Sequence, residues 1–320
     1  IKADPAWRLD RFDRNGAASV FVRAARARIA ETPFLDQRWR RPDDETLAVD
    51  TRALDGLDAP APPAFIWHSA FCCSTLLAGL LNKPGAALPV REPDVLMTVA
   101  NVKRNQGADV ARRLLGPVLS HVARGYEPGE RAVIKPTNLA NAILSDCLSV
   151  RPDAKAILLT SSLEAFLVSI VKKGEAGRAF ARLMYTIFAM DGRAPQMSEL
   201  ERMRCSDLQI AALVWHMQIA EMNAAARAAP GRTAWLDGDA FLAAPEETLN
   251  RIDAFFGLGL GEEFATAAAT GPAMTRNAKS GEAYGAKDRA SETDRVREAL
   301  GEDLPRIAEW SRQVFPDTPR

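Results

Sequence analysis

Short apolar segments alternate with helical stretches along most of this 320-residue chain. The segments with strand character are residues 64–68, 87–91, 132–135, 156–160 and 233–236. Helix-start signals stand between them, such as Pro93-Asp94 and Ser162 with Glu164 close behind. Alternation of this kind is typical of a parallel sheet covered by helices on both faces. The pattern therefore predicts an α/β fold with three layers.

The first part of the chain differs from the rest in composition. Residues 1–60 are rich in Arg, Asp and Ala and run into the proline-rich segment 58–63. Because repeated proline disfavours both helix and central strand, this segment is expected to be a linker. We predict a helical N-terminal extension over residues 1–60 and an α/β domain over 61–320. Residues 178–229 are almost wholly helical in pattern and predict an insert that walls one side of a cleft.

The overall charge and the cysteines exclude several classes of protein. Lys plus Arg and Asp plus Glu both total 41, so no global field draws the chain to nucleic acid or to an anionic membrane. The apolar runs are too short for a membrane span, and no secretion signal is evident, which predicts a cytoplasmic protein. Four cysteines form no C-x-x-C pair, and the three histidines lie far apart, so we expect reduced thiols and no metal site.

One segment, residues 64–81, has the pattern of a buried strand, a tight turn of small residues and a helix that begins at Ser74-Thr75. A helix start leaves backbone N–H groups unpaired at the positive end of the helix dipole, where an anion can bind. The G-x-x-x-x-G-K-[ST] phosphate-binding pattern is absent, and no Gly or Lys lies between His68 and Leu77. Taken alone, the segment fits a phosphate or sulfate site and an ordinary strand-to-helix turn equally well.

Polar residues gather where the predicted strands end, which is where ligands bind in open α/β sheets. The five groups are 71–75 after the first strand, Arg91-Glu92-Pro93 after the second, Lys135-Pro136-Thr137-Asn138 after the third, Thr160-Ser161-Ser162 with Ser169 and Lys172-Lys173 after the fourth, and 276–281 near the C-terminus. A lysine that closes an apolar strand must reach an anion or solvent, so Lys135 is a candidate phosphate ligand.

Together these groups resemble the 3′-phosphoadenylyl sulfate (PAPS) dependent sulfotransferases, particularly their bacterial branch, over residues 64–289. Cys73-Ser74-Thr75-Leu76-Leu77 looks like the end of their S-G-S-T-L-L loop. Lys135-Pro136-Thr137-Asn138 looks like their lysine-bearing strand end, and residues 152–159 followed by Ser169 are similar to the strand and helix that clasp the 3′-phosphate. Leu236-Asp237-Gly238-Asp239 followed by Pro245-Glu246-Glu247-Thr248-Leu249 is the most specific match.

The resemblance implies a P-loop NTPase-like sulfotransferase fold that moves a sulfuryl group from PAPS, its co-substrate, to a hydroxyl or amine of a small molecule or glycan, without a metal. Glu92 would accept the acceptor's proton, and Lys135 would offset charge on the leaving phosphate. The expected donor-binding residues are Cys72, Cys73, Ser74, Thr75, Ser161, Ser169, Lys172, Arg276, Lys279 and Gly281. The oligomeric state and the acceptor itself stay open.

The chain departs from the family at three positions, and each leaves an alternative open. Cys73 stands where Gly is usual, Phe71 where Lys or Arg often precedes the loop serine, and Ser161 where an Arg is expected. These changes fit a catalytically degenerate protein that binds a nucleotide or a protein partner. The simpler interpretations are that Glu92 caps a helix or pairs with Arg91, and that Ser169 bonds to its own helical turn.

Overall fold

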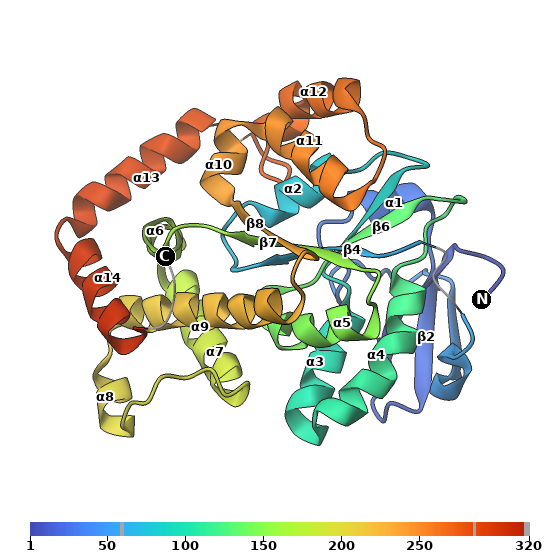
Figure 1. Ribbon diagram of the computed structural model, residues 1–320, viewed down its shortest axis with the longest axis horizontal. Helices are drawn as coiled ribbons and strands as arrows, with labels where there is room; N and C mark the ends of the chain where they lie inside the picture. Colours follow the sequence, from blue (N-terminus) through green and yellow to red (C-terminus); the bar gives the residue numbers. More distant parts are fainter. Residues whose placement is uncertain (58–60, 284–285, 317–320) are drawn as a thin grey trace.

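A five-stranded parallel sheet forms the centre of the molecule (Figure 1). In the computed structural model, which describes residues 1–57, 61–283 and 286–316, the strand order is β5-β6-β4-β7-β8. The strands are β4 (Ala64–His68), β5 (Ala87–Arg91), β6 (Arg131–Lys135), β7 (Lys155–Thr160) and β8 (Thr233–Asp237). All neighbouring pairs are parallel. The predicted α/β fold is confirmed, and every predicted strand forms within one residue of its expected bounds.

The sheet is covered on both faces, and the inner parts of β4, β5, β6 and β7 are apolar and buried, whereas the edge strand β8 is partly exposed. All five residues of β4 and of β5 are buried. Along β4 the side chains alternate, so that Phe65 and Trp67 pack into one core cluster while Ala64 and Ile66 pack into another. The two clusters lie on opposite faces of the sheet and fix the register of each strand.

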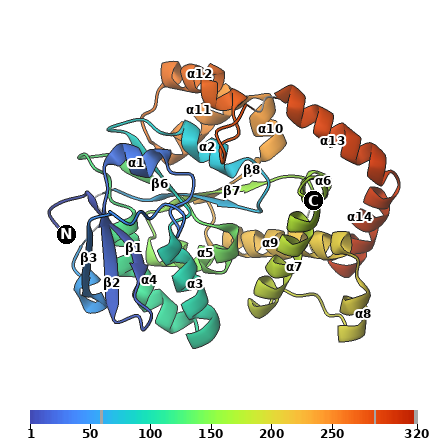
Figure 2. The same cartoon turned by 180° about the vertical axis from the view of Figure 1, so that it is seen from behind.

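Helices cover the two faces as the alternation predicts (Figures 1 and 2). One face carries α2 (Ser74–Leu80), α10 (Gly238–Ala243), α11 (Pro245–Phe256), α12 (Glu262–Thr270) and η3 (Pro272–Thr275). The other carries α3 (Asp94–Gln106), α4 (Ala108–Val122), η2 (Asn138–Ile143) and α5 (Leu144–Val150). Helices begin and end where the sequence signals predict. The Ser162 hydroxyl caps the helix after β7, and α11 begins at Pro245 and is followed by the left-handed Gly257.

A third group of helices extends the molecule beyond the end of β7. It comprises α6 (Leu163–Lys172), α7 (Gly174–Met190), α8 (Glu199–Arg204), α9 (Asp207–Ala228), α13 (Ala286–Leu300) and α14 (Asp303–Val314). Residues 178–229, expected to be helical, lie in α7, α8 and α9 and the connections between them. A separate core cluster holds this group together, with Phe166, Met184 and Leu213 fully buried in it. No helix in the described part of the chain is long and apolar enough to cross a membrane.

The prediction of a helical N-terminal extension is wrong. Residues 1–57 form a three-stranded antiparallel sheet of β1 (Trp7–Phe12), β2 (Ala18–Arg23) and β3 (Thr46–Asp50), with only the short helices α1 (Arg26–Glu31) and η1 (Thr51–Leu54). Ser19 and Phe21 are buried while Ala18 and Val20 are less so, which is a strand pattern that the Arg- and Ala-rich composition hides. Phe21 shares a core cluster with Phe65 of the central sheet. Asp58, Ala59 and Pro60 of the expected linker lie outside the described residues.

Candidate functional site

The turn between β4 and α2 has an unusual backbone. Ala70, Phe71 and Cys73 have φ angles of 65°, 53° and 62°, and Glu92, at the end of β5, has a φ of 51°. These four are the non-glycine residues with positive φ in the described part of the chain. This left-handed conformation is unfavourable for residues with a Cβ, and strained residues of this kind cluster at functional sites. Cys73 adopts the conformation for which a glycine would serve best.

His68 ties this turn to the segment that follows β6. Its Nδ1 accepts a hydrogen bond from the Ala70 N–H at 3.1 Å, so Nε2 carries the proton and donates to the Pro136 carbonyl at 3.0 Å. Burial, reinforced by the positive charges of Lys135 and Lys279, holds the pKa of His68 well below its usual 6.5. His68 is therefore a neutral structural side chain.

Glu92 and Lys135 form an ion pair at the tips of two neighbouring strands. Arg91 and Lys135 are in register in the β5–β6 pair, and the Lys135 ammonium donates to Glu92 Oε1. Lys135 is fully buried, and burial lowers its pKa while Glu92 opposes that shift. Of this pair, Glu92 is the residue on a cavity wall. Lys135 thus meets an anion, as a lysine at the end of a buried strand must, but that anion is a carboxylate of the protein.

The two simple structural roles considered for Glu92 do not occur. Arg91 turns away from it and donates from Nε and Nη2 to the carbonyls of Thr32 and Ala30, at 3.0 and 2.7 Å. The helix after β5 has no side-chain cap at its N-terminus. Glu92 therefore neither pairs with Arg91 nor caps α3, and Lys135 holds its carboxylate at the cavity wall.

A basic cavity of about 680 Å³ opens beside the turn after β4. Its walls carry Ser74 and Thr75 from the start of α2 and Ser169 from α6. Five basic side chains line it against two acidic ones, Glu282 and Glu292; the basic ones are Lys172, Lys173, Arg276, Lys279 and Arg295. A cavity with such an excess of positive charge is suited to a polyanionic ligand. We call it the basic cavity.

A second, smaller cavity of about 370 Å³ adjoins the first, and we call it the small cavity. Its walls combine apolar side chains, which include Phe34, Met97, Leu139 and Phe180, with three carboxylates, those of Asp36, Glu92 and Asp94. The two cavities share Phe71, Ser74, Thr75 and Lys279. The ring of Phe71 packs against Phe166 and Phe180, with centroid distances of 5.6 and 6.1 Å. The start of α2 is consequently a wall of both cavities.

Lys279 stands at the boundary between the two cavities. Its ammonium lies over the ring of Phe34, with 5.8 Å between Nζ and the ring centroid. Burial lowers the pKa of Lys279; Glu92 acts against this shift, and the positive charges of Lys173 and Arg38 add to it. An ammonium at this place can interact with an anion that spans both cavities.

Most of the remaining residues predicted to bind the donor line the basic cavity. Cys73, Ser169, Lys172 and Arg276 line the basic cavity together with Ser74, Thr75 and Lys279. Ser169 Oγ donates to the Ala165 carbonyl of its own helix at 2.9 Å, and Lys172 pairs with Glu292 of α13 at 2.8 Å. Gly281, with φ 76°, donates its N–H to the Asn277 carbonyl and so shapes the loop that carries Lys279.

Two of the predicted donor-binding residues lie elsewhere. Cys72 is buried in the core, with Sγ 3.5 Å from the Leu159 carbonyl, and burial raises the pKa of its thiol to about 12. Ser161 lines a third cavity, on the other side of α6 from Ser169. In the described residues, no cluster of His, Cys, Asp and Glu side chains is placed to hold a metal ion.

Comparison with solved structures finds similar chains. The structure is similar to those of sulfotransferases. The sulfotransferase domain from the curacin biosynthetic pathway aligns with a TM-score of 0.46 at 14% identity, over 75% of this chain and 97% of that one. The sulfotransferase domain of the Synechococcus PCC 7002 olefin synthase gives 0.44 at 17%, over 80% and 95%, and a sulfotransferase from Alicyclobacillus acidocaldarius gives 0.40 at 12%, over 80% and 96%. No protein-family model and no curated protein matches the sequence.

Several residues that line the two cavities could not be identified from sequence motifs. Phe34 and Arg38 come from the N-terminal segment, and Arg38 Cζ lies 3.8 Å from the Phe34 ring centroid. Glu292 and Arg295 come from α13. Neither pair directly follows a predicted strand, and neither forms part of a known sequence motif. For Phe34 and Arg38, the available sequence signal is the alternation of apolar and polar residues in β1 and β2. That alternation predicts a small sheet, and the segment that follows it carries these two residues.

Proposed function

We propose that this protein transfers a sulfuryl group from PAPS to a hydroxyl or amine of a small acceptor. The observation that carries the proposal is the pair of adjoining cavities that share the start of α2 and Lys279, one lined by five basic side chains and the other with Glu92 on its wall. A group-transfer enzyme needs two such compartments, because the donor and the acceptor must meet in line at one boundary.

The basic cavity suits the donor in charge and in size. PAPS carries a 3′-phosphate and a 5′-phosphosulfate, and five cations stand on the walls of a space of about 680 Å³. Arg276 and Lys279 come from one loop, and Lys172 and Lys173 come from the end of α6, so cations approach from two sides. This distribution supports a ligand with two separated anionic groups. It also supplies charge that Phe71 and Ser161, in place of the family's cations, do not.

The boundary between the cavities carries the groups that transfer requires. As the acceptor oxygen or nitrogen attacks sulfur, the bond from sulfur to the phosphate oxygen breaks and adenosine 3′,5′-bisphosphate leaves. The acceptor's proton passes to the Glu92 carboxylate, which Lys135 orients. Lys279, with Lys135 behind Glu92, offsets negative charge on the transferring and leaving groups. The Ser74 and Thr75 hydroxyls lie at the same boundary.

Turnover of PAPS by the Glu92→Gln variant tests the assignment of the base. The wild type is incubated with PAPS and a panel of small aromatic and aliphatic alcohols and amines, and release of adenosine 3′,5′-bisphosphate is measured. We expect Glu92→Gln to lower release at least a hundredfold while binding of the bisphosphate stays within about threefold of wild type. Glu31→Gln, an exposed substitution on α1, is the matched control and should be unaffected.

The same experiment separates the enzyme from a non-catalytic relative. Cys73 and Ser161, in place of the expected Gly and Arg, are the observations that favour a protein that binds the nucleotide without turning it over. Bisphosphate binding without acceptor-dependent release from PAPS would favour that function. Equal loss of binding and of turnover in Glu92→Gln would reject the division of roles between the two cavities.

A further inference from the structure

We propose that Asn138 determines which acceptors enter the small cavity, and that the acceptor carries a second hydrogen-bond donor, which binds Asn138 Oδ1, besides the group that takes the sulfuryl group. Asn138 is the first residue of η2 and lines the small cavity together with Glu92. The inference rests on the function proposed above, because it names a chemical feature of the acceptor in that reaction.

The orientation of the Asn138 amide follows from its neighbours in the core. Gln218 Nε2 donates to the Val214 carbonyl at 3.4 Å, so Gln218 presents its oxygen, Oε1, to Asn138. Asn138 Nδ2 donates to that oxygen at 3.0 Å and to Met184 Sδ at 3.2 Å. Both hydrogens of the amide are thus used within the protein, and the group left to bind a ligand is the carbonyl oxygen.

Asn138 Oδ1 is a hydrogen-bond acceptor that the protein leaves unused. Asn138 is only 4% exposed, and Oδ1 has no partner among the residues that the structure describes. Oδ1 is nevertheless not one of the described side-chain atoms that are enclosed without a partner, so it keeps surface that a ligand can reach in the cavity that Asn138 lines. A fixed acceptor in a nearly buried residue selects for ligands that donate to it, because any other ligand leaves it unpaired.

The rest of the small cavity favours an uncharged molecule with a ring. Each of the three carboxylates on its walls forms an ion pair within the protein: Asp36 with Arg38, Asp94 with Arg40 and Glu92 with Lys135. Apolar contact comes from Phe34, Met97, Leu139 and Phe180, around a space of about 370 Å³. A small ring compound with two hydroxyl groups fits these walls, with one hydroxyl at Glu92 and the other at Asn138.

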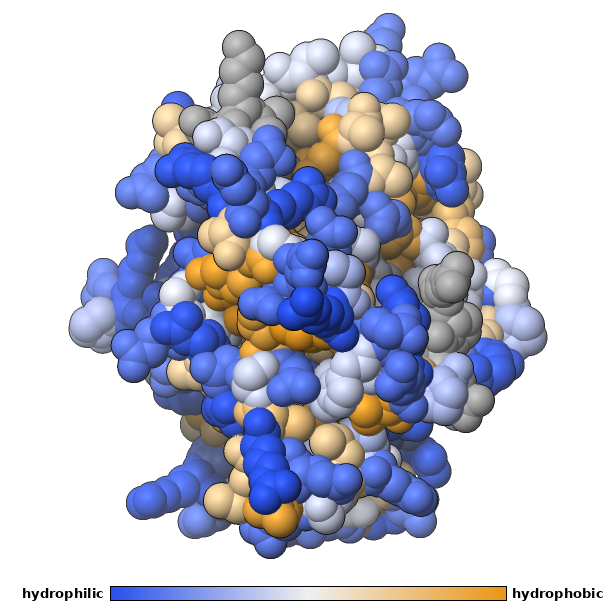
Figure 3. Space-filling view, turned by 90° about the vertical axis from the view of Figure 1, so that its left-hand side faces the viewer, coloured by the Kyte–Doolittle hydropathy of each residue, from blue (hydrophilic) through white to orange (hydrophobic). Residues whose placement is uncertain are grey.

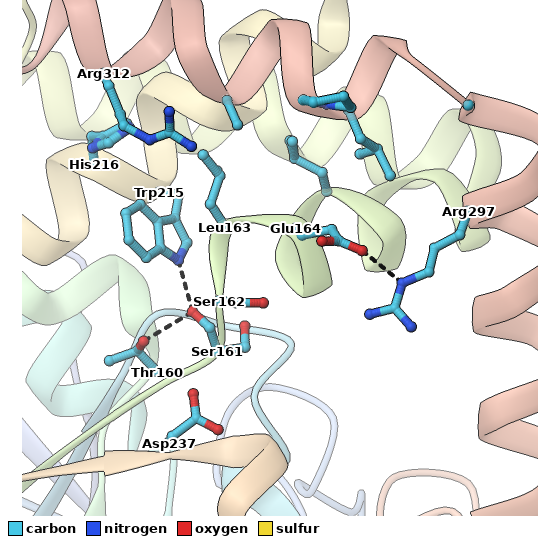
Figure 4. Close-up of a pocket in the computed structure, with 15 residues that line it drawn as sticks. Thr160, Ser161, Ser162, Leu163, Glu164, Trp215, His216, Asp237, Arg297 and Arg312 are labelled. Carbon is cyan, nitrogen blue, oxygen red and sulfur yellow. Dashed lines mark hydrogen bonds and ion pairs between the residues drawn. The ribbon is translucent and has the colours of Figure 1, made fainter. Parts of the chain in front are cut away.

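The unpartnered polar atoms beside the third cavity differ from Asn138 Oδ1 (Figure 4). The Ser161 hydroxyl and His216 Nδ1 are fully enclosed by protein, so a ligand in that cavity cannot reach them. Arg297 on its wall pairs with Glu164 at 2.6 Å. Seen from the side of α13 and α14, hydrophobic residues gather toward the middle of the molecular face, with hydrophilic residues around them (Figure 3). Apolar surface of this kind does not identify a ligand, whereas the reachable oxygen of Asn138 does specify one chemical feature.

Titration calorimetry of the full chain with catechol, resorcinol and hydroquinone, each beside its monomethyl ether, tests the proposal. Each ether keeps one hydroxyl for Glu92 and lacks only the second donor. We expect at least one diol to bind with a dissociation constant below about 5 mM and its ether to bind at least fivefold more weakly. Hydrophobic burial alone would favour the ether, which is the more apolar of the two. No binding of any diol at 5 mM, or a preference below fivefold in all three pairs, would overturn the proposal.

This comparison requires neither a substitution nor turnover, so its failure is distinguishable from failure of the proposed transfer reaction. Acceptor-dependent release of adenosine 3′,5′-bisphosphate from PAPS, without a preference for any diol, would leave the reaction standing and reject the role of Asn138. A preference for a diol in a protein that never turns over PAPS would support the role of Asn138 in binding and reject the transfer reaction.

A pair of asparagine-to-leucine substitutions locates the second donor. Leucine is similar in size to asparagine and cannot accept a hydrogen bond, so Asn138→Leu should reduce the preference for the diol to within about twofold while the ether still binds. Asn105→Leu, at an exposed position of α3, is the matched control and should keep the wild-type preference. A fivefold preference retained in a folded Asn138→Leu protein would contradict the assignment to Asn138.

Discussion

At the scale of single residues, Lys279 connects the two halves of the proposed reaction. It lines both the basic cavity and the small cavity. The sequence places it in a basic loop near Gly281 and identifies it as a donor ligand. Its position at the boundary follows from the fold, because the loop reaches over the turn after β4 only when η3 packs against α2.

Bisphosphate affinity should fall at high pH because of Lys279. Burial lowers the pKa of its ammonium below the usual 10.5, so the side chain loses its charge at a lower pH than an exposed lysine does. Affinity is therefore full below that pKa and is lost as the pH rises through it. Calorimetric titrations from pH 7 to 10 should show this fall in the wild type and not in Lys279→Arg, whose charge persists. Lys173→Arg is the control, and an alkaline fall that survives in Lys279→Arg would contradict the assignment.

The backbone conformation of Cys73 leads to a prediction about stability. Its φ of 62° is costly for any residue with a Cβ, and glycine adopts it freely. We expect Cys73→Gly to be more stable than Cys73→Ala by about 1 kcal/mol in urea unfolding, since both lack the thiol and only alanine retains the strain. A glycine variant no more stable than the alanine variant would show that the turn is relaxed.

At the scale of elements, the sequence predicts the central sheet well because the signal there is local. Each strand is a continuous apolar run, and each end carries a helix start or a proline. The turn after β4, Glu92 and Lys135 could be identified for the same reason. The N-terminal sheet could not, because Arg and Asp residues interrupt its alternation and its partners in the core, such as Phe65, are distant in sequence. Glu292 reaches the basic cavity only through the packing of α13 against α6.

The contact between α13 and α6 should tune affinity for the bisphosphate. Glu292 pairs with Lys172 and lines the basic cavity, so an anionic ligand must compete with its carboxylate for that lysine. Glu292→Gln should therefore bind adenosine 3′,5′-bisphosphate about fivefold more tightly, and the gain should shrink at high salt. Glu298→Gln, at an exposed position of the same helix, is the matched control. Unchanged or weaker binding in Glu292→Gln would argue against a ligand phosphate at Lys172.

At the scale of the whole molecule, three buried histidines belong to three different core regions. His68 lies at the end of β4, His121 packs edge-on against Phe21 of the N-terminal sheet, and His216 stacks on Phe315. Burial is the main cause that lowers the pKa of each, to about 4 for His121 and His216. From the sequence, His68 and His216 are expected to be buried core histidines, which the structure bears out, whereas His121, expected on a polar helical face, is buried as well.

This arrangement makes the stability of the protein sensitive to mild acid. Below pH 6.5 the unfolded chain takes up protons on its histidines while the folded chain does not, so the free energy of unfolding falls as the pH is lowered. Each histidine with a native pKa of about 4 should contribute a loss of roughly 2 kcal/mol between pH 7 and pH 5. Urea unfolding at both pH values measures it. His121→Gln should show a smaller difference between the two than wild type, and an equal difference would contradict the linkage.

The central claim is that the basic cavity receives a nucleotide with two anionic groups next to a carboxylate that can act as a base. Calorimetric titration with adenosine 3′,5′-bisphosphate tests it most directly, with Lys279→Ala beside the wild type and Lys2→Ala as a control at a distant lysine. We expect one site per chain in the wild type and in Lys2→Ala, and about tenfold weaker binding in Lys279→Ala. No heat of binding to the wild type at millimolar bisphosphate would contradict the claim.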